Sequence, residues 1–106
     1  MIRRLHRASY GRAGRLVPAG AHGLRAGMVR LRAGQVMDWH STQARQELLI
    51  MLRGRVCVEI QQASRRIRRV VLNVPQSLLL SPRMVHRVVN RSRTPAGYIY
   101  VTAPTA

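Results

Sequence analysis

The chain has 106 residues, which is the length of one domain and is enough to bury one hydrophobic core. Its single cysteine, Cys57, excludes an intrachain disulfide and fits a reducing compartment. No apolar run approaches the ~20 residues that span a bilayer. We therefore expect a soluble, cytoplasmic protein with no membrane partner, in which Cys57 is a small buried hydrophobe rather than a nucleophile.

The charge of the chain is extreme. Nineteen arginines, no lysine and three acids give a net charge of +16. A field of this size attracts nucleic acid and other polyanions without specificity. The arginines are scattered, however, and the exclusion of lysine favours a bias in codon composition over selection for phosphate binding, in which lysine serves well. The sequence leaves open whether the arginine excess has a function.

Residues 1–23 form a segment that is rich in arginine and contains no acid. Glycine and proline interrupt any amphipathic helix in it, at Gly11, Gly14, Pro18 and Gly20. We expect a basic N-terminal arm that is loosely structured or adds an edge strand. A single barrel domain over residues 24–106 is expected to follow.

From residue 24 onward, short apolar runs alternate with turn residues. Seven segments of four to nine residues have the composition of strands, and no segment has a helix-length periodic pattern. They are residues 24–32, 47–53, 55–60, 66–72, 77–80, 86–90 and 98–102. Gly54 is expected to supply the positive φ of a tight hairpin turn. The pattern predicts an all-β sandwich or barrel.

Two of the predicted strands are apolar on both faces, in the runs 48–52 and 78–80. A strand with one exposed face alternates apolar and polar residues, so both faces of these runs must be covered by a second sheet or by a partner chain. Because a chain this short has little material for both, we expect a homodimer. The arginine-rich segment 65–69 is expected to be a solvated edge that resists strand pairing.

Potential metal ligands lie beside two of these strands. The run GQVMDWHSTQARQELLIMLRG contains His40 and Glu47, and the run NVPQSLLLSPRMVHRVVN contains His86. Two imidazoles and one carboxylate make a 2-His-1-carboxylate set that leaves positions open for substrate. The chain has only three carboxylates, so the occurrence of one at this spacing carries weight.

The two runs resemble the two sequence motifs of the cupins. In the first motif, every spacing is reproduced, and Thr42 stands where the family has its second His. In the second motif, the His and the Asn that follows it are kept. Pro75, Ser81 and Arg83 occupy the positions of a Gly, a Pro and a Gly. The resemblance covers roughly residues 24 to 103.

The resemblance implies an all-β double-stranded β-helix, a small jelly-roll-like barrel, in a family that commonly forms homodimers. It also implies that His40, Glu47 and His86 hold one divalent transition metal, and these ligands suit Fe, Mn, Ni or Zn alike. Thr42 is a weak ligand, so affinity should be lower than in a four-ligand cupin. In the alternative, the two histidines hydrogen-bond Glu47 and Thr42 in a metal-free pocket.

Strand pleating places Glu47, Leu49 and Met51 on one face, so the carboxylate projects into an apolar interior, as in many small-ligand sites. Besides the three ligands, the residues expected to line this pocket are Thr42, Gln43, Trp39, Met51 and Arg83. Two interpretations of Arg83 stay open: it is a strained surface residue without a role, or it guards the pocket mouth and, with Arg45 and Arg87, selects an anionic molecule.

Two functions remain open. In the first, a small cupin binds a small anionic molecule at a His/Glu centre, with or without a divalent metal and with or without enzymatic activity. In the second, an arginine-rich scaffold of the same fold binds nucleic acid or another polyanion. Four aromatic residues are too few for a base-stacking platform, and no nucleic-acid recognition motif is present, which favours the first function.

Overall fold

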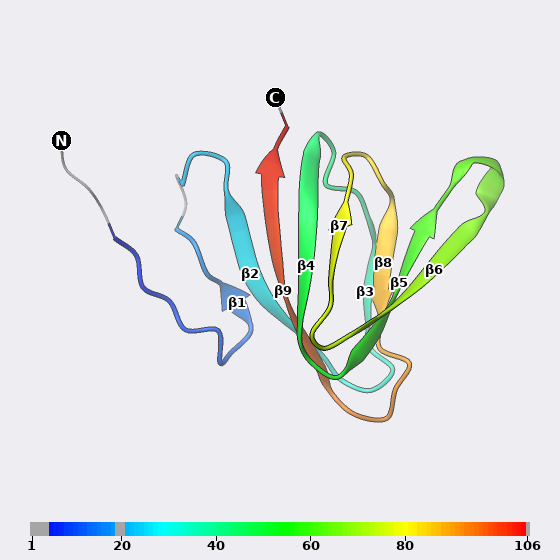
Figure 1. Ribbon diagram of the computed structural model, residues 1–106, viewed down its shortest axis with the longest axis horizontal. Helices are drawn as coiled ribbons and strands as arrows, with labels where there is room; N and C mark the ends of the chain where they lie inside the picture. Colours follow the sequence, from blue (N-terminus) through cyan, green and yellow to red (C-terminus); the bar gives the residue numbers. More distant parts are fainter. Residues whose placement is uncertain (1–4, 19–20, 106) are drawn as a thin grey trace.

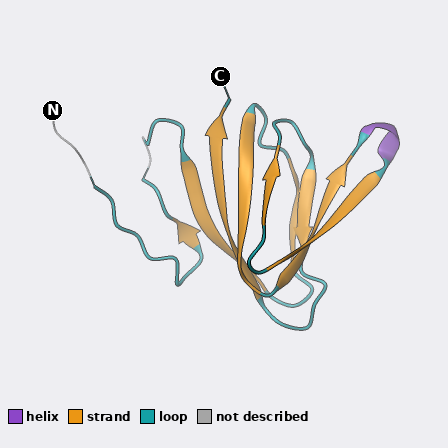
Figure 2. Cartoon of the chain, viewed as in Figure 1, coloured by secondary structure: helices purple, strands orange, loops and turns teal. Residues whose placement is uncertain are grey.

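The computed structural model describes residues 5–18 and 21–105, and in these ranges the regular secondary structure is β-strand apart from one 3-10 turn (Figure 1, Figure 2). Two antiparallel sheets have the strand orders β1-β2-β9-β4-β7 and β3-β8-β5-β6. The strands are β1 (Gly14–Arg15), β2 (Arg25–Leu31), β3 (Val36–His40), β4 (Arg45–Arg53), β5 (Arg55–Gln61), β6 (Ile67–Asn73), β7 (Ser77–Leu80), β8 (His86–Val89) and β9 (Ala96–Pro104). A 3-10 turn, Ala63–Arg65, joins β5 to β6. Within the described ranges, no helix has the length and apolar character needed to span a membrane.

The chain is folded back on itself around the loop between β5 and β6. From this loop outward, strands form nested antiparallel pairs, β5 with β6, β4 with β7, β3 with β8 and β2 with β9. Each successive pair belongs to the opposite sheet, so the doubled chain winds around one interior. This arrangement is the double-stranded β-helix that the resemblance to the cupins implies, and it brings segments distant in sequence to the same cavity.

All seven predicted strands are present, with bounds that differ by at most two residues. The sequence does not predict β3, because a register shift between Met37 and His40 breaks the alternation by which a strand is recognised. The two-residue β1 pairs with β2 at the edge of its sheet. The rest of the predicted arm includes residues 1–4 and 19–20, which lie outside the described residues.

The turn at Gly54 differs from the predicted hairpin. β4 and β5 belong to different sheets and are not paired with each other, so the chain turns a corner from one sheet to the other. The positive φ is present, at 70°. A Cβ atom at this position would lie 2.6 Å from the carbonyl oxygen of Pro95, so glycine is needed for space as well as for its backbone conformation.

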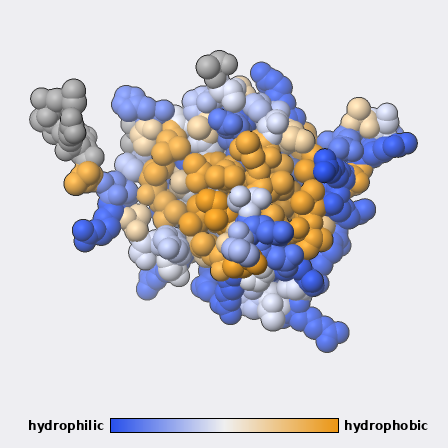
Figure 3. Space-filling model, viewed as in Figure 1, coloured by the Kyte–Doolittle hydropathy of each residue, from blue (hydrophilic) through white to orange (hydrophobic). Residues whose placement is uncertain are grey.

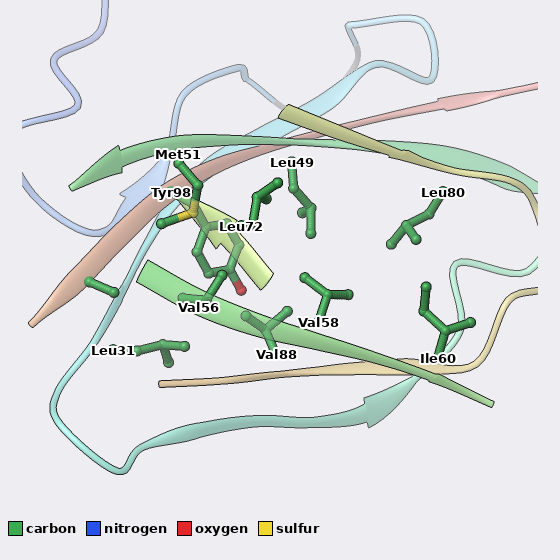
Figure 4. Packing of buried hydrophobic residues seen from close by; sticks show 11 residues of the cluster. Leu31, Leu49, Met51, Val56, Val58, Ile60, Leu72, Leu80, Val88 and Tyr98 are labelled. Carbon is green, nitrogen blue, oxygen red and sulfur yellow. The ribbon is translucent and has the colours of Figure 1, made fainter. Parts of the chain in front are cut away.

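The hydrophobic core lies between the two sheets (Figure 4). Val56, Val58 and Ile60 of β5 point inward from the four-stranded sheet, and Leu49 and Met51 of β4 face them from the other sheet. The other buried members of the cluster are Leu31, Leu72, Leu80, Val88, Ala96 and Tyr98. Because every second side chain of β4 points inward, the residue at position 47 shares this interior.

The outer face of the five-stranded sheet is also apolar. Leu48, Ile50 and Leu52 of β4 point away from the core and are half-buried, and Leu79, which pairs with Leu48, is 61% exposed. Figure 3 shows apolar residues gathered over β9, β4 and β7. The second sheet covers one face of these strands, and the other face is partly open to solvent as far as residues 5–18 and 21–105 are concerned. Self-association through this face stays a prediction.

We expect Leu79→Arg to prevent self-association, because a guanidinium buried against a second copy's apolar face would lack a partner. Val71→Arg is the matched control, since Val71 is 54% exposed and lies on the edge strand of the opposite sheet. Sedimentation at moderate salt and micromolar protein gives the mass of each species. A monomeric wild type, or the same mass for both variants, would show that this face is not an interface.

The outer face of the four-stranded sheet carries a buried carboxylate. The side chain of Glu59 in β5 points away from the core and is 0% exposed. Three arginines bind it, through Nε of Arg69 at 2.7 Å, Nε of Arg87 at 2.5 Å and Nη2 of Arg91 at 3.0 Å. Burial by itself would raise the pKa of Glu59, but the hydrogen bonds and charges of the arginines outweigh burial and lower this pKa.

Glu59→Gln should lower the melting midpoint at neutral pH, because it removes the charge that three arginines share. A loss of about 1 kcal/mol corresponds to roughly 4–8 °C in a domain of this size. The folded pKa of Glu59 is lowered, so its contribution is complete above the unfolded value of 4.5 and is lost as the pH falls through the folded value. The difference in melting midpoint between wild type and Glu59→Gln should therefore become smaller in acid. Circular dichroism measures both midpoints.

Asp38→Asn is the control for this measurement, because Asp38 is an exposed carboxylate. The midpoint of this variant should stay close to that of the wild type across the same pH range. A gap between wild type and Glu59→Gln that does not change with pH would contradict the role assigned to the arginines.

Candidate metal centre and barrel cavity

Three side chains that can hold a metal converge inside the barrel. His40 ends β3, His86 begins β8, and the two residues are paired in the antiparallel ladder. Glu47 enters from β4 in the facing sheet and is buried. One ligand atom from each of the three residues lies within 4.8 Å of the others. The structure thus brings together the three ligands expected from the sequence.

Backbone carbonyl groups orient both imidazole rings. Nδ1 of His40 lies 2.8 Å from the carbonyl oxygen of Asp38, and Nδ1 of His86 lies 2.9 Å from that of Met84. A carbonyl oxygen only accepts hydrogen bonds, so each Nδ1 carries the hydrogen and donates it. The hydrogen bonds to the carbonyls thus select the tautomer with hydrogen on Nδ1. In this tautomer Nε2 is the atom that can bind a metal.

His86 and Glu47 make the closest contact of the site. Nε2 of His86 lies 2.8 Å from Oε1 of Glu47, and both side chains are almost fully buried. Burial opposes the charged form of the ring, but the hydrogen bonds to Glu47 and to the Met84 carbonyl, with the negative charge of Glu47, raise the pKa of His86 above 6.5. Without a metal, a proton lies between these two groups, and a metal ion would replace it.

The donor set fits a divalent transition metal, because two neutral imidazoles and one carboxylate suit Fe(II), Mn(II), Ni(II) or Zn(II). Thr42 follows β3 and lines the same cavity. Its hydroxyl donates to the carbonyl oxygen of Arg45 at 2.7 Å, so its hydrogen is used by the backbone. His40, Glu47 and His86 are thus the imidazole and carboxylate groups that could hold the ion.

The ligands open onto a cavity of about 640 Å³. This volume lies within the range of about 300–1,000 Å³ that is typical of small-molecule sites. Its apolar lining consists of Val29, Met37, Ala44, Leu49, Val88, Tyr98 and Tyr100. Its polar lining, besides the three ligands, consists of Arg25, Ser41, Thr42, Gln43, Arg45 and Thr102. Burial, with the charge of Glu47, raises the pKa of Tyr98 well above its ordinary value, so its hydroxyl stays protonated.

Of the residues expected around the ligands, Thr42 and Gln43 line the cavity. Trp39 does not, because the register shift in β3 turns it to the outer side of the four-stranded sheet. There the guanidinium carbon of Arg87 lies 4.8 Å from the centre of its ring. Trp39, which is expected to line the pocket, thus lies on the opposite side of the sheet from it.

Met51 and Arg83 also lie outside the cavity lining. Met51 points inward as expected but packs in the core beside Tyr98 (Figure 4), away from the ligands. Arg83 has a left-handed backbone with φ of 66°, and its N–H donates to the carbonyl oxygen of Gln43. This hydrogen bond joins the loop before β8 to the loop before β4, and this is the contribution of Arg83 to the site.

The arginines at the cavity differ from the expected set. Arg87 binds Glu59 on the outer face of the sheet. Arg45 lines the cavity, but its guanidinium donates to the hydroxyl and carbonyl oxygens of Thr102. Arg25 also lines the cavity, and no carboxylate among residues 5–18 and 21–105 pairs with it. Arg45 has no carboxylate partner among these residues either, but its guanidinium is engaged by Thr102.

Sequence reasoning does not identify Arg25, Tyr98, Tyr100 and Thr102 as lining residues. β2 pairs with β9 in a register that sets Arg25 opposite Thr102, and these residues share the inner face. They are far from the ligands in sequence, and only the nested pairing brings them together. The alternation of Tyr98, Tyr100 and Thr102 in a predicted strand is the signal by which part of this wall could have been found.

Comparison with known proteins gives matches among solved structures, whereas no protein-family model and no curated protein matches the chain. The cupin domain of Schizosaccharomyces pombe Cnp3 is 13% identical with a TM-score of 0.76, covering 88% of this chain and 64% of that one. Oxalate oxidase is 15% identical with a TM-score of 0.71, covering 77% and 42%. A Klebsiella pneumoniae protein with a double-stranded β-helix domain is 19% identical with a TM-score of 0.73, covering 93% and 83%.

The chain spans less than two thirds of the oxalate oxidase and Cnp3 chains that it matches. At these identities, the likeness concerns the path of the backbone. It agrees with the nested strand pairs and with the two packed sheets. This chain has the double-stranded β-helix fold of the cupins.

Proposed function

We propose that the chain binds a small anionic molecule in the barrel cavity, at a divalent metal ion held by His40, Glu47 and His86. The observation that carries the proposal is the convergence of their three ligand atoms within 4.8 Å. Both rings are oriented by backbone carbonyls so that Nε2 is available. Glu47 and His86 satisfy each other without a metal, and an ion would take the place of the proton between them and add His40 as a third ligand.

Positive charge in the cavity supports an anionic ligand. A divalent ion bound by one carboxylate would leave the centre positive, and Arg25 adds a guanidinium that no described carboxylate neutralises. Arginine binds carboxylate groups in a planar, two-point geometry. Oxalate oxidase, whose name gives a small dicarboxylate as its substrate, has a similar fold, which is consistent with a ligand of this class.

The metal, when bound, would act as a Lewis acid toward an oxygen atom of the ligand. The residues of the chain would do the rest. The apolar walls exclude water from the bound molecule and strengthen its electrostatic contacts. The Tyr98 hydroxyl stays protonated and can therefore act only as a neutral hydrogen-bonding group in the wall.

Addition of Mn(II), Fe(II), Ni(II) or Zn(II) should raise the melting midpoint of the wild type, because the unfolded chain has no preformed site. A metal at about a hundred times its Kd stabilises the fold by about 2.7 kcal/mol, which is roughly 10 °C or more in a domain of this size. Glu47→Gln keeps the shape of the side chain and removes its charge, so it should lose most of this rise. Thermal melting with each metal in turn measures both.

The matched control is Asp38→Asn, which removes a carboxylate on the strand that carries His40 but outside the cavity lining. It should respond to metal like the wild type, and all proteins should lack a histidine tag. If none of the four metals raises the wild-type midpoint, or if Glu47→Gln responds equally, the metal proposal is wrong. His40, Glu47 and His86 would then form a metal-free hydrogen-bonded group.

Gly27→Ala should alter the ligand cavity without touching the metal ligands. A Cβ atom at Gly27 would lie 2.6 Å from the hydroxyl oxygen of Tyr100 and 2.7 Å from two of its ring carbons, so the ring must move. We expect the variant to keep its metal response and to bind oxalate about tenfold more weakly, by calorimetry on metal-loaded protein. Gly97→Ala is the control, because the atom nearest its added Cβ is the flexible end of Met28. Unchanged affinity in Gly27→Ala would exclude Tyr100 from the ligand site.

A further inference from the structure

A second group of charged side chains lies on the outer face of the four-stranded sheet, apart from the barrel cavity. Glu59 pairs with Arg87 in β8 and with Arg69 in β6, so these three residues form one row across neighbouring strands. Arg91 reaches the same carboxylate from the segment after β8. We call these four residues the arginine cluster.

The arginine cluster has more positive charge than Glu59 requires. One arginine neutralises a buried carboxylate, and here three guanidinium groups lie within 3.0 Å of one carboxylate. Three positive charges and one negative charge leave a net charge of +2. Guanidinium groups repel one another, so the carboxylate that holds them together creates a fixed concentration of positive charge on this face.

The outer edges of these guanidinium groups remain available. Arg69 and Arg87 bind Glu59 through Nε, and within the described part of the chain no residue accepts a hydrogen bond from their Nη atoms. The carboxylate is fully buried, whereas the side chains of Arg69 and Arg91 are 60% and 55% exposed. An incoming anion therefore meets the donors of the cluster, and the carboxylate lies beneath them.

Arg87 is also held by an aromatic ring. Its guanidinium carbon lies 4.8 Å from the centre of the Trp39 ring, which is a cation–π contact. Trp39 is the only tryptophan in the chain, so its fluorescence reports on this face alone. The neighbouring carboxylate of Asp38 accepts the backbone N–H of Trp39 at 2.7 Å and is thus engaged by its own strand.

We propose that the arginine cluster is a binding site for a phosphoryl group. The planar fork of N–H donors in arginine matches the oxygens of a phosphate group. A net charge of +2 complements one dianionic phosphate monoester or two successive phosphodiester groups of a nucleic acid strand. The chemistry of recognition is the same for both. The cluster lies on the opposite side of the sheet from His86, so this site is separate from the metal centre.

Titration of the full chain at constant ionic strength, followed by Trp39 fluorescence, tests the proposal. One series uses inorganic phosphate and the other uses a short single-stranded DNA oligonucleotide. Saturation by inorganic phosphate supports the proposal with a small phosphorylated ligand as the source. Saturation by the oligonucleotide alone supports it with a nucleic acid backbone as the source. The absence of a saturable change in both series overturns it.

Matched variants separate this site from the general charge of the chain. Arg91→Gln should weaken binding about tenfold, the effect of one hydrogen bond between charged groups. Replacing Arg69 and Arg91 together should abolish saturation. Arg30→Gln removes the same charge from an exposed position on the other sheet and should bind like the wild type. Equal weakening in Arg30→Gln and Arg91→Gln would show that overall charge alone attracts the anion, and would overturn the proposal.

Thermal melting without ligand shows whether each variant folds. If the double variant does not fold, Arg91→Gln carries the test, because Glu59 keeps Arg69 and Arg87 as partners in it. The outcomes given for Arg91→Gln and Arg30→Gln then decide the question by themselves.

Discussion

Strand alternation determines where the two buried carboxylates of this chain find partners. β4 turns Glu47 into the barrel, and β5 turns Glu59 to the outer face, although both lie in largely apolar runs. Buried carboxylates need opposite charges or hydrogen-bond donors. Adjacent residues of β8 supply them, because His86 points inward to Glu47 and Arg87 points outward to Glu59. A slip of β8 by one residue would exchange these partners and disrupt both sites at once.

The same constraint accounts for the use of acids in a chain with a net charge of +16. The chain has only three acids, and two of them are buried, each bound to cationic or imidazole groups. Arg25 and Arg45 belong to the polar part of the cavity lining. The core consists of apolar side chains. The positive charge of the chain is therefore kept at surfaces, where water solvates it, and two acids concentrate it at defined places.

The strands could be predicted because alternation is a local pattern, and the ligand group could be predicted because its spacing resembles the cupin motifs. Alternation along each strand predicts that Glu47 faces the interior, and the order of the motifs predicts that His40 and His86 approach it. One feature, the register shift in β3, accounts for two failures. It breaks the alternation by which β3 could be recognised in the sequence. It also turns Trp39 to the outer face. Arg25 is missed as a lining residue for another reason, because its position depends on pairing between strands at opposite ends of the chain.

The departures from the cupin motifs have different physical consequences. Arg83 stands at a glycine position and adopts φ of 66°, which costs a side-chain-bearing residue roughly 1–2 kcal/mol. Its N–H still bonds to the carbonyl of Gln43, so the two loops beside the ligands stay joined. Thr42 stands at a ligand position, and its hydroxyl binds the backbone instead. The first departure lowers stability and keeps the geometry, whereas the second puts a weak hydroxyl ligand in place of an imidazole. We therefore expect this chain to differ from a four-ligand cupin in metal affinity and in open coordination positions, and to keep the same barrel.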